Sequence, residues 1–121
     1  MRFVNPLLLS LLALSSCNGK VPDSIARGEF GEVFAPLSCD RQKECSLGGY
    51  QADHDDYKDC LENMAAEWEA EAEKYESYDC EYDAAGGAAL YEVLLDSTCG
   101  ELYNAAVEDA YDEAFCCAGC D

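Results

Sequence analysis

The sequence predicts an all-α fold, a small bundle of about four helices held together by disulfide bonds. Between residues 24 and 116, apolar residues recur at steps of three and four, the period of one face of an α-helix. No stretch alternates apolar and polar residues for long enough to predict a strand. The cysteines recur every 15 to 20 residues, about one helix plus a turn, at Cys45, Cys60, Cys80, Cys99 and Cys116.

The first sixteen residues have the layout of a bacterial lipoprotein signal peptide. A single cation, Arg2, precedes an apolar core that is shorter than the ~20 residues needed to span a bilayer. The core ends in Leu14-Ser15-Ser16-Cys17, which looks like the cleavage box after which the cysteine becomes a lipidated N-terminus. We expect a signal peptide at 1–16, a tether at 17–23 and one domain at 24–121. An ordinary secretory signal with Cys17 merely nearby is the alternative.

The cysteine count favours the lipoprotein interpretation. Nine cysteines are an odd number, which would leave one thiol unpaired in an oxidising compartment. If Cys17 carries diacylglycerol and a further acyl chain such as palmitate, eight remain for four disulfides in a small exported domain. The eight are Cys39, Cys45, Cys60, Cys80, Cys99, Cys116, Cys117 and Cys120.

The first helix is predicted to begin at Asp23 or Ser24, because either side chain can cap a helix N-terminus. Three residues weaken this prediction, since glycine and proline disfavour a helix interior: Gly28, Gly31 and Pro36. The apolar stripe consists of Ile25, Phe30, Val33, Phe34 and Leu37. We expect the helix to be followed by a turn.

The segment 47–50 is expected to form that turn, and the strongest helix follows at 55–75. The apolar face of this helix is formed by Tyr57, Leu61, Met64, Trp68, Ala72 and Tyr75, while its opposite side is almost entirely acidic. A third helix is predicted at 84–96 with Asp83 as its cap, and a fourth at 101–116.

Helix geometry limits the disulfide pairings. A straight helix between Cys60 and Cys80 separates them by roughly 25–30 Å, whereas a disulfide needs Cα atoms within about 7 Å. An up-down bundle instead places four cysteines at each end. One end collects Cys39, Cys45, Cys60 and Cys99, and the other collects Cys80, Cys116, Cys117 and Cys120. Excluding the strained vicinal bridge Cys116–Cys117 leaves six arrangements, of which we favour Cys45–Cys60 with Cys39–Cys99.

The acidic charge excludes several classes of partner. Removal of Arg2 with the signal changes the formal charge from −19 to −20. Such a chain repels nucleic acid and anionic headgroups, so we expect no nucleic-acid partner. Cations and basic proteins are the partners that remain.

Three motifs carry candidate chemistry. Cys117 to Cys120 is a Cys-x-x-Cys, which can be a redox or zinc motif, but we interpret it as structural disulfide cysteine. The only histidine, His54, lies among Asp53, Asp55 and Asp56, which are weak candidates for divalent-cation binding rather than an EF-hand. The third motif, an acidic surface around Cys80, carries Tyr75, Tyr78 and Tyr82 and is our candidate partner-binding surface. The alternative is that these rings pack the end of the bundle.

A family resemblance accompanies these motifs. Cys39-Asp40-Arg41-x-x-x-Cys45, the Cys60…Trp68 helix, and then Cys80 and Cys99 resemble small cysteine-rich lipoproteins of predatory or soil bacteria such as the myxobacteria. The resemblance covers most of the mature chain and implies a disulfide-rich domain on a lipid anchor, with no catalytic residues to carry over. This chain departs from the pattern in its acidity and its Cys-Cys-x-x-Cys tail.

We therefore expect a lipid-anchored cell-envelope protein, at the outer membrane or the periplasmic face, that binds a basic envelope protein through its acidic, tyrosine-rich surface. A weak divalent-cation-binding protein is the alternative. No Gly-x-Ser-x-Gly, phosphate-binding loop or Ser/His/Asp set occurs in the sequence, so we expect neither an enzyme nor a cofactor.

Overall fold

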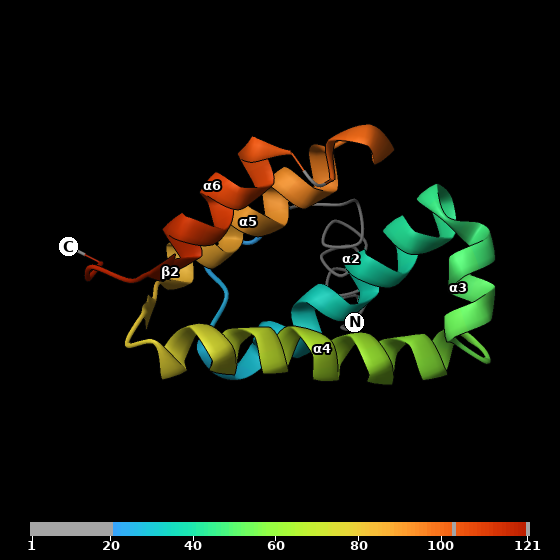
Figure 1. Cartoon of the computed structure of the whole chain (residues 1–121), viewed down its shortest axis with the longest axis horizontal. Coiled ribbons are helices and arrows are strands. Elements are labelled where there is room, and N and C mark those ends of the chain that lie inside the picture. The colour runs from blue at the N-terminus through green and yellow to red at the C-terminus, as the bar shows by residue number, and fades with distance from the viewer. Residues whose placement is uncertain (1–20, 103, 121) are drawn as a thin grey trace, which may run out of the picture.

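The structure, a computed structural model, describes residues 21–102 and 104–120. The predicted signal peptide at 1–16 and the predicted lipidation site Cys17 lie outside the described residues. Over the described residues the fold is all-α, as predicted (Figure 1). Its elements in chain order are η1 (Arg27–Glu29), α2 (Phe30–Cys45), α3 (Leu47–Asp53), α4 (Tyr57–Ser77), β1 (Glu81–Tyr82), α5 (Ala84–Asp96), η2 (Cys99–Glu101), α6 (Ala105–Ala114) and β2 (Phe115–Cys116).

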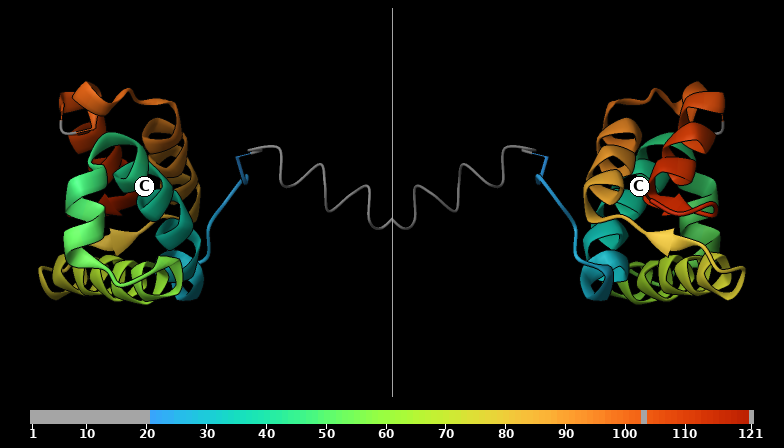
Figure 2. Two further views of the ribbon diagram at one scale, coloured as in Figure 1. Left: turned by 90° about the vertical axis from the view of Figure 1, so that its right-hand side faces the viewer. Right: turned by 90° about the vertical axis from the view of Figure 1, so that its left-hand side faces the viewer.

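Two helical hairpins make up the domain. Helix α2 packs mainly on α4, and α5 packs mainly on α6. Helix α3 connects the ends of α2 and α4, while β1 leads from α4 into α5 (Figure 1). Helix α4 lies along one side of the molecule and the α5–α6 pair along the other, with α2 between them, and the end views in Figure 2 show the same order.

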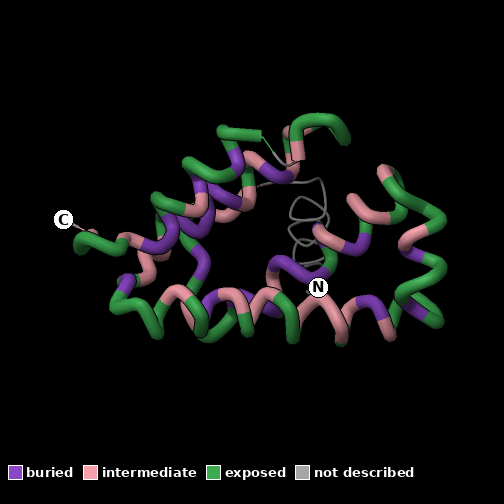
Figure 3. The backbone as a smooth tube through the Cα atoms, viewed as in Figure 1, coloured by how far each residue is buried: buried purple, intermediate pink, exposed green. Residues whose placement is uncertain are grey.

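The main core lies where the two hairpins meet, and α2, α4, α5 and α6 all contribute buried residues to it; buried segments are purple in Figure 3. The ring of Phe30 is fully buried at its centre. Its centroid lies 4.7 to 5.6 Å from the rings of Phe34, Trp68, Tyr82 and Phe115. Aromatic pairs at such distances contribute ~0.5–1.5 kcal/mol each beyond the area they bury. One aromatic cluster therefore joins both hairpins.

Two glycines permit close packing of the helices. A Cβ atom at Gly31 would lie 2.7 Å from the carbonyl oxygen of Ala65 on α4. A Cβ atom at Gly86 would lie 2.2 Å from the carbonyl oxygen of Glu113 on α6. Gly31 lowers helix propensity in the sequence, but here it lets α2 approach the backbone of α4.

The first helix begins later than predicted, and neither Asp23 nor Ser24 caps it. Residues 21–26 are not helical, and α2 begins at Phe30 after the 3-10 turn η1. The N–H of Ile25 donates to the Ala84 carbonyl at 3.0 Å, and the Ile25 side chain is buried. This long-range contact holds the segment extended.

The predicted turn at 47–50 is wrong, because these residues lie in helix α3. Tyr50 from this helix is buried against the Cys39–Cys60 disulfide, a contact that favours the helical conformation despite two glycines. Helix α4 starts two residues later than predicted, at Tyr57, where the Asp56 carboxylate accepts from the N–H of Asp59.

The third helix has the predicted limits, and the fourth is shorter than predicted. Asp83 caps α5 as expected, accepting from the N–H of Gly86 at 2.6 Å. Asn104 caps α6, and Cys99–Glu101 form the separate turn η2. After α6, β2 pairs antiparallel with β1, two residues each, and Tyr82 lies opposite Phe115. This short pair is the strand structure that the sequence did not predict.

Four disulfides link the described cysteines, two at each end of the domain as predicted. The bridges are Cys39–Cys60, Cys45–Cys99, Cys80–Cys117 and Cys116–Cys120. The favoured pairs Cys45–Cys60 and Cys39–Cys99 are wrong. Cys39 lies on the buried side of α2 that faces α4, and its Cα atom is 6.1 Å from that of Cys60. Cys45 ends α2 and meets Cys99 of η2 instead.

Candidate functional site

The three tyrosines of the predicted partner surface do not form one exposed patch. Tyr75 stacks on Phe115, with ring centroids 4.9 Å apart and planes 11° from parallel. Tyr82 is half-buried, and its hydroxyl donates to the Ile25 carbonyl at 2.5 Å. Only Tyr78 is largely exposed, at 68 %. Partner binding by these residues stays a prediction, and Tyr78 is the member of the set with the most exposed ring.

Tyr75 instead belongs to a stack of four rings between α4 and α6. Trp68 and Tyr111 are stacked at 5.9 Å, Tyr111 and Tyr75 at 6.0 Å, and Tyr75 continues onto Phe115. We call these four residues the aromatic stack. Two of its members come from α4, and the other two come from α6 and β2. The stack therefore forms only when the two hairpins dock.

Carboxylates surround the aromatic stack. Burial raises the pKa of the Tyr75 phenol above its usual value, and the nearby charges of Glu71, Asp112 and Glu108 raise it further. Burial also raises the pKa of Tyr111, again with Glu71 adding to the effect. A carboxylate raises the pKa of a phenol because it opposes a second negative charge. Carboxylates from α4 and α6 therefore converge on Tyr75, and Glu71 acts on both rings.

A groove of about 750 Å³ opens beside the aromatic stack, between the two hairpins. We call it the inter-hairpin groove. Apolar residues from α2, α4, α5 and α6 form much of its lining, including Leu37, Met64, Leu94 and Val107. Its charged and aromatic lining consists of Arg41, Asp53, Glu67, Trp68, Glu71, Glu108 and Tyr111. A concave, largely apolar site with a few polar groups is the usual form of a binding site.

Trp68 is the structural centre of this groove. Its indole Nε1 donates to the Ser38 hydroxyl at 2.6 Å, and its ring packs against Phe34 with centroids 4.6 Å apart. The sequence predicted that Trp68 lies on the apolar face of a helix, and two residues of that face, Met64 and Trp68, also line the groove. The steps of three and four in this helix could not indicate the groove, because residues of α6 form its opposite wall.

Arg41 lies in the lining near Cys45 and Cys99. Its guanidinium donates to Glu44 at 2.6 Å and to the Ser97 carbonyl. Its Nε is buried without a hydrogen-bond partner among the described residues. Two of the three guanidinium nitrogens of Arg41 thus donate hydrogen bonds within the protein.

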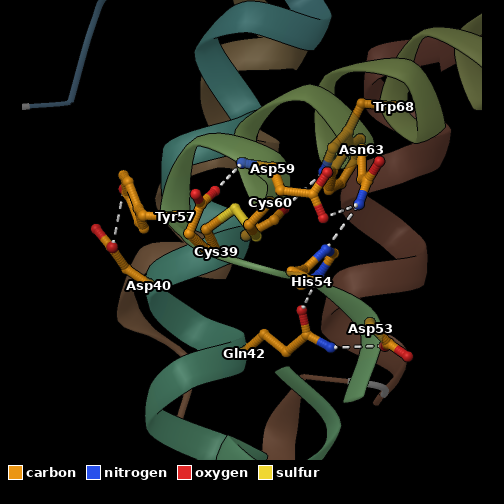
Figure 4. The surroundings of a disulfide bond; sticks show 12 residues. Cys39, Asp40, Gln42, Asp53, His54, Tyr57, Asp59, Cys60, Asn63 and Trp68 are labelled. Atoms are coloured by element: carbon orange, nitrogen blue, oxygen red, sulfur yellow. Dashed lines mark hydrogen bonds between the residues drawn. A yellow bond between two sulfur atoms is a disulfide. The ribbon is translucent and has the colours of Figure 1, made fainter. Parts of the chain in front are cut away.

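His54 is buried in a chain of hydrogen bonds rather than exposed at a helix end (Figure 4). Gln42 donates through its amide nitrogen to Asp53, so its amide oxygen faces His54 and accepts from the ring Nε2 at 2.9 Å. Asn63 donates to the other ring nitrogen, Nδ1, at 2.9 Å and to Asp59 at 3.3 Å. Both ring nitrogens of His54 therefore have a partner, Nε2 in Gln42 and Nδ1 in Asn63. The network cross-links α2, the loop after α3, and α4.

The candidate cation ligands are not arranged as a metal site. Asp56 accepts from the N–H of Asp59, and Asp53 accepts from Gln42. Within residues 21–102 and 104–120, no three His, Cys, Asp or Glu side chains gather in a way that could hold a metal ion. Both ends of the Cys-x-x-Cys motif, Cys117 and Cys120, are disulfide-bonded to other cysteines. Divalent-cation binding by Asp53, Asp55 and Asp56 stays a prediction.

The fold and groove define a small, disulfide-bonded, all-α protein with an acidic, aromatic cleft. Comparison with known proteins found no match to a family model, to a curated protein or to a solved structure. No helix in the described part of the chain is both long and apolar enough to cross a membrane.

Proposed function

We propose that this chain is a lipid-anchored protein of the cell envelope that binds a basic partner protein through the face formed by α4 and α6. The anchor is Cys17, after removal of residues 1–16. The single observation that carries the binding role is the aromatic stack, which lies between helices whose carboxylates converge on it.

The balance of charge supports a basic partner. The sequence has 26 acidic residues against 7 basic ones. Among the described residues the ion pairs involve only two cations, Arg27 and Arg41. Most carboxylates are therefore available to attract a positively charged surface. Such complementarity mainly raises the association rate and is weakened by salt.

The aromatic rings support specific binding of a partner protein, rather than an acidic surface that only repels other anionic molecules. Tyrosine and tryptophan contribute large contact areas with few rotatable bonds, so they lose little entropy on binding. Tyr78 adds an exposed ring beside the Cys80–Cys117 disulfide. The proposed partner surface thus extends from Tyr78 to the inter-hairpin groove.

The binding role is tested with a defined probe. The protein, purified in detergent with its disulfides intact, is titrated against a fluorescently labelled peptide rich in lysine and arginine, and anisotropy is measured at low and at high salt. We expect binding that weakens steeply with salt. A matched acidic peptide serves as the control. Absence of binding to the basic peptide at low salt would refute the proposal.

The anchor is tested by the intact mass of protein extracted from membranes, before and after reduction. We expect the mass of diacylglycerol and further acyl chains on a chain that begins at Cys17. Reduction is expected to add eight hydrogens, because four disulfides are broken. An unmodified N-terminus at another residue contradicts the lipoprotein assignment.

A further inference from the structure

We propose that the inter-hairpin groove is the specificity site of this protein and that its occupant is an arginine side chain of the basic partner. The inference rests on the proposed function and assigns a recognition chemistry to one part of the α4–α6 face.

Carboxylates from both walls of the groove lack partners. Glu67 and Glu71 come from α4, and Glu108 comes from α6. Within the part of the chain that the structure describes, none of the three forms an ion pair or a side-chain hydrogen bond. Glu71 is half-buried, so its charge is less screened than that of a fully exposed carboxylate. A cation that enters the groove therefore meets negative charge from two sides.

The rings beside these carboxylates suit a planar cation. Trp68 and Tyr111 lie with their planes 10° from parallel, and both line the groove. A guanidinium stacks on aromatic faces and donates two parallel hydrogen bonds to a carboxylate, whereas an ammonium is a compact, strongly hydrated charge. Because aromatic rings and carboxylates line the same groove, the groove favours arginine over lysine.

Arg41 does not fill this role itself. Its guanidinium is held by Glu44 and by the Ser97 carbonyl, away from Glu67, Glu71 and Glu108, with which it forms no ion pair in the described residues. The lining as a whole carries four carboxylates and this single cation. The groove thus keeps a net negative charge after its internal pairing is complete.

The length of an arginine side chain also matches the mixed lining. Its three methylene groups pack on apolar surface while the guanidinium reaches polar groups. In the groove the apolar surface comes from Leu37, Met64 and Val107, and the polar groups are the carboxylates near Tyr111. One arginine can therefore contact both kinds of lining at once.

The test uses Trp68 as its reporter, because it is the only tryptophan in the sequence. The detergent-purified protein is titrated with three short peptides of one sequence that carry arginine, lysine or the neutral isostere citrulline. We expect the arginine peptide to shift the Trp68 emission and to bind about 3- to 10-fold more tightly than the lysine peptide. The citrulline peptide is expected to cause no shift. Equal affinities for arginine and lysine, or no change in Trp68 emission, would overturn the inference.

A pair of charge-matched variants locates the binding. E71Q/E108Q removes two carboxylates from the groove, and E73Q/D109N removes two exposed carboxylates from the same helices outside it. We expect the first variant to lose about tenfold in affinity for the arginine peptide and the second to stay within about twofold of wild type. Equal losses in both variants would show diffuse attraction, so the groove inference would fail while the proposed function stood. If no basic peptide binds the wild-type protein, both fail.

Discussion

Replacement of Gly86 by alanine tests the idea that the groove depends on the close approach of α5 and α6. A Cβ atom at this position would lie 2.2 Å from the Glu113 carbonyl oxygen, 2.6 Å from its carbonyl carbon and 2.9 Å from the Ala114 Cα. All three atoms belong to the backbone of α6, so no flexible side chain can move aside. The two helices must separate instead.

The expected loss of stability follows from the size of that separation. An ordinary contact begins at 3.4 Å, so the new methyl group forces α5 away from α6 by about 1 Å. Overpacking of this kind costs about 1–3 kcal/mol. Because the contacts are with backbone atoms, we expect the upper part of that range, about 2–3 kcal/mol. Alanine regains ~1 kcal/mol of helix propensity, which leaves a net loss of about 1–2 kcal/mol. For a domain of this size, the melting temperature is then expected to fall by roughly 5–15 °C.

The assay is thermal unfolding followed by circular dichroism, with the disulfides intact. Gly48→Ala is the matched control, because Gly48 lies in α3 and a Cβ atom there meets nothing within 4 Å. The control is expected to raise stability by up to ~1 kcal/mol. A Gly86→Ala protein as stable as the wild type would refute the reasoning, as would an equal loss in the control.

Three further predictions concern the buried polar groups and the disulfides. Asn63→Ala leaves the buried Nδ1 of His54 without its donor, and we expect a loss of about 1–3 kcal/mol in urea unfolding; a change below ~0.5 kcal/mol would contradict the network. Burial raises the pKa of Tyr82 to about 12, so its contribution to stability is complete below pH 10 and is lost as pH rises through about 12. Tyr82→Phe is therefore expected to reduce the fall in urea midpoint between pH 10 and about 12. An equally steep fall in the variant counts against ionisation of Tyr82 as its cause. Mild thiol treatment followed by alkylation and mass analysis is expected to open the more accessible Cys116–Cys120 before the buried Cys39–Cys60; the reverse order would show that accessibility does not control reduction.

The elements that the sequence predicted best are those with local signals. Helix α5 has its predicted limits, because Asp83 caps its start and the apolar residues that follow keep one period. The two groups of four cysteines follow from helix length alone. Helix length does not predict the pairs Cys39–Cys60 and Cys45–Cys99, because these depend on which side of α2 faces α4.

The features that the sequence missed depend on contacts between distant residues. The extended segment before α2 is held by the hydrogen bond from Ile25 to Ala84, and α3 is held by the burial of Tyr50. For the candidate site, the sequence placed Trp68 and Tyr75 on one helical face. It could not show that Tyr111 would stack between them, because that requires the docking of α6 on α4.

The carboxylates on α4 have two opposing effects: they repel one another within the helix, and they attract a cation to the groove. Glu67 and Glu71 are four residues apart, a like-charge spacing that costs a helix a few tenths of a kcal/mol. On another part of the helix surface, Arg27 offsets such repulsion through ion pairs of 2.9 Å to Glu69 and 2.7 Å to Glu76. Beside the groove, no described cation forms an ion pair with Glu67 or Glu71. A cation bound there would relieve repulsion already present in the free protein as well as add its own attraction. The carboxylates that weaken α4 in isolation are therefore the ones from which a positively charged partner gains most.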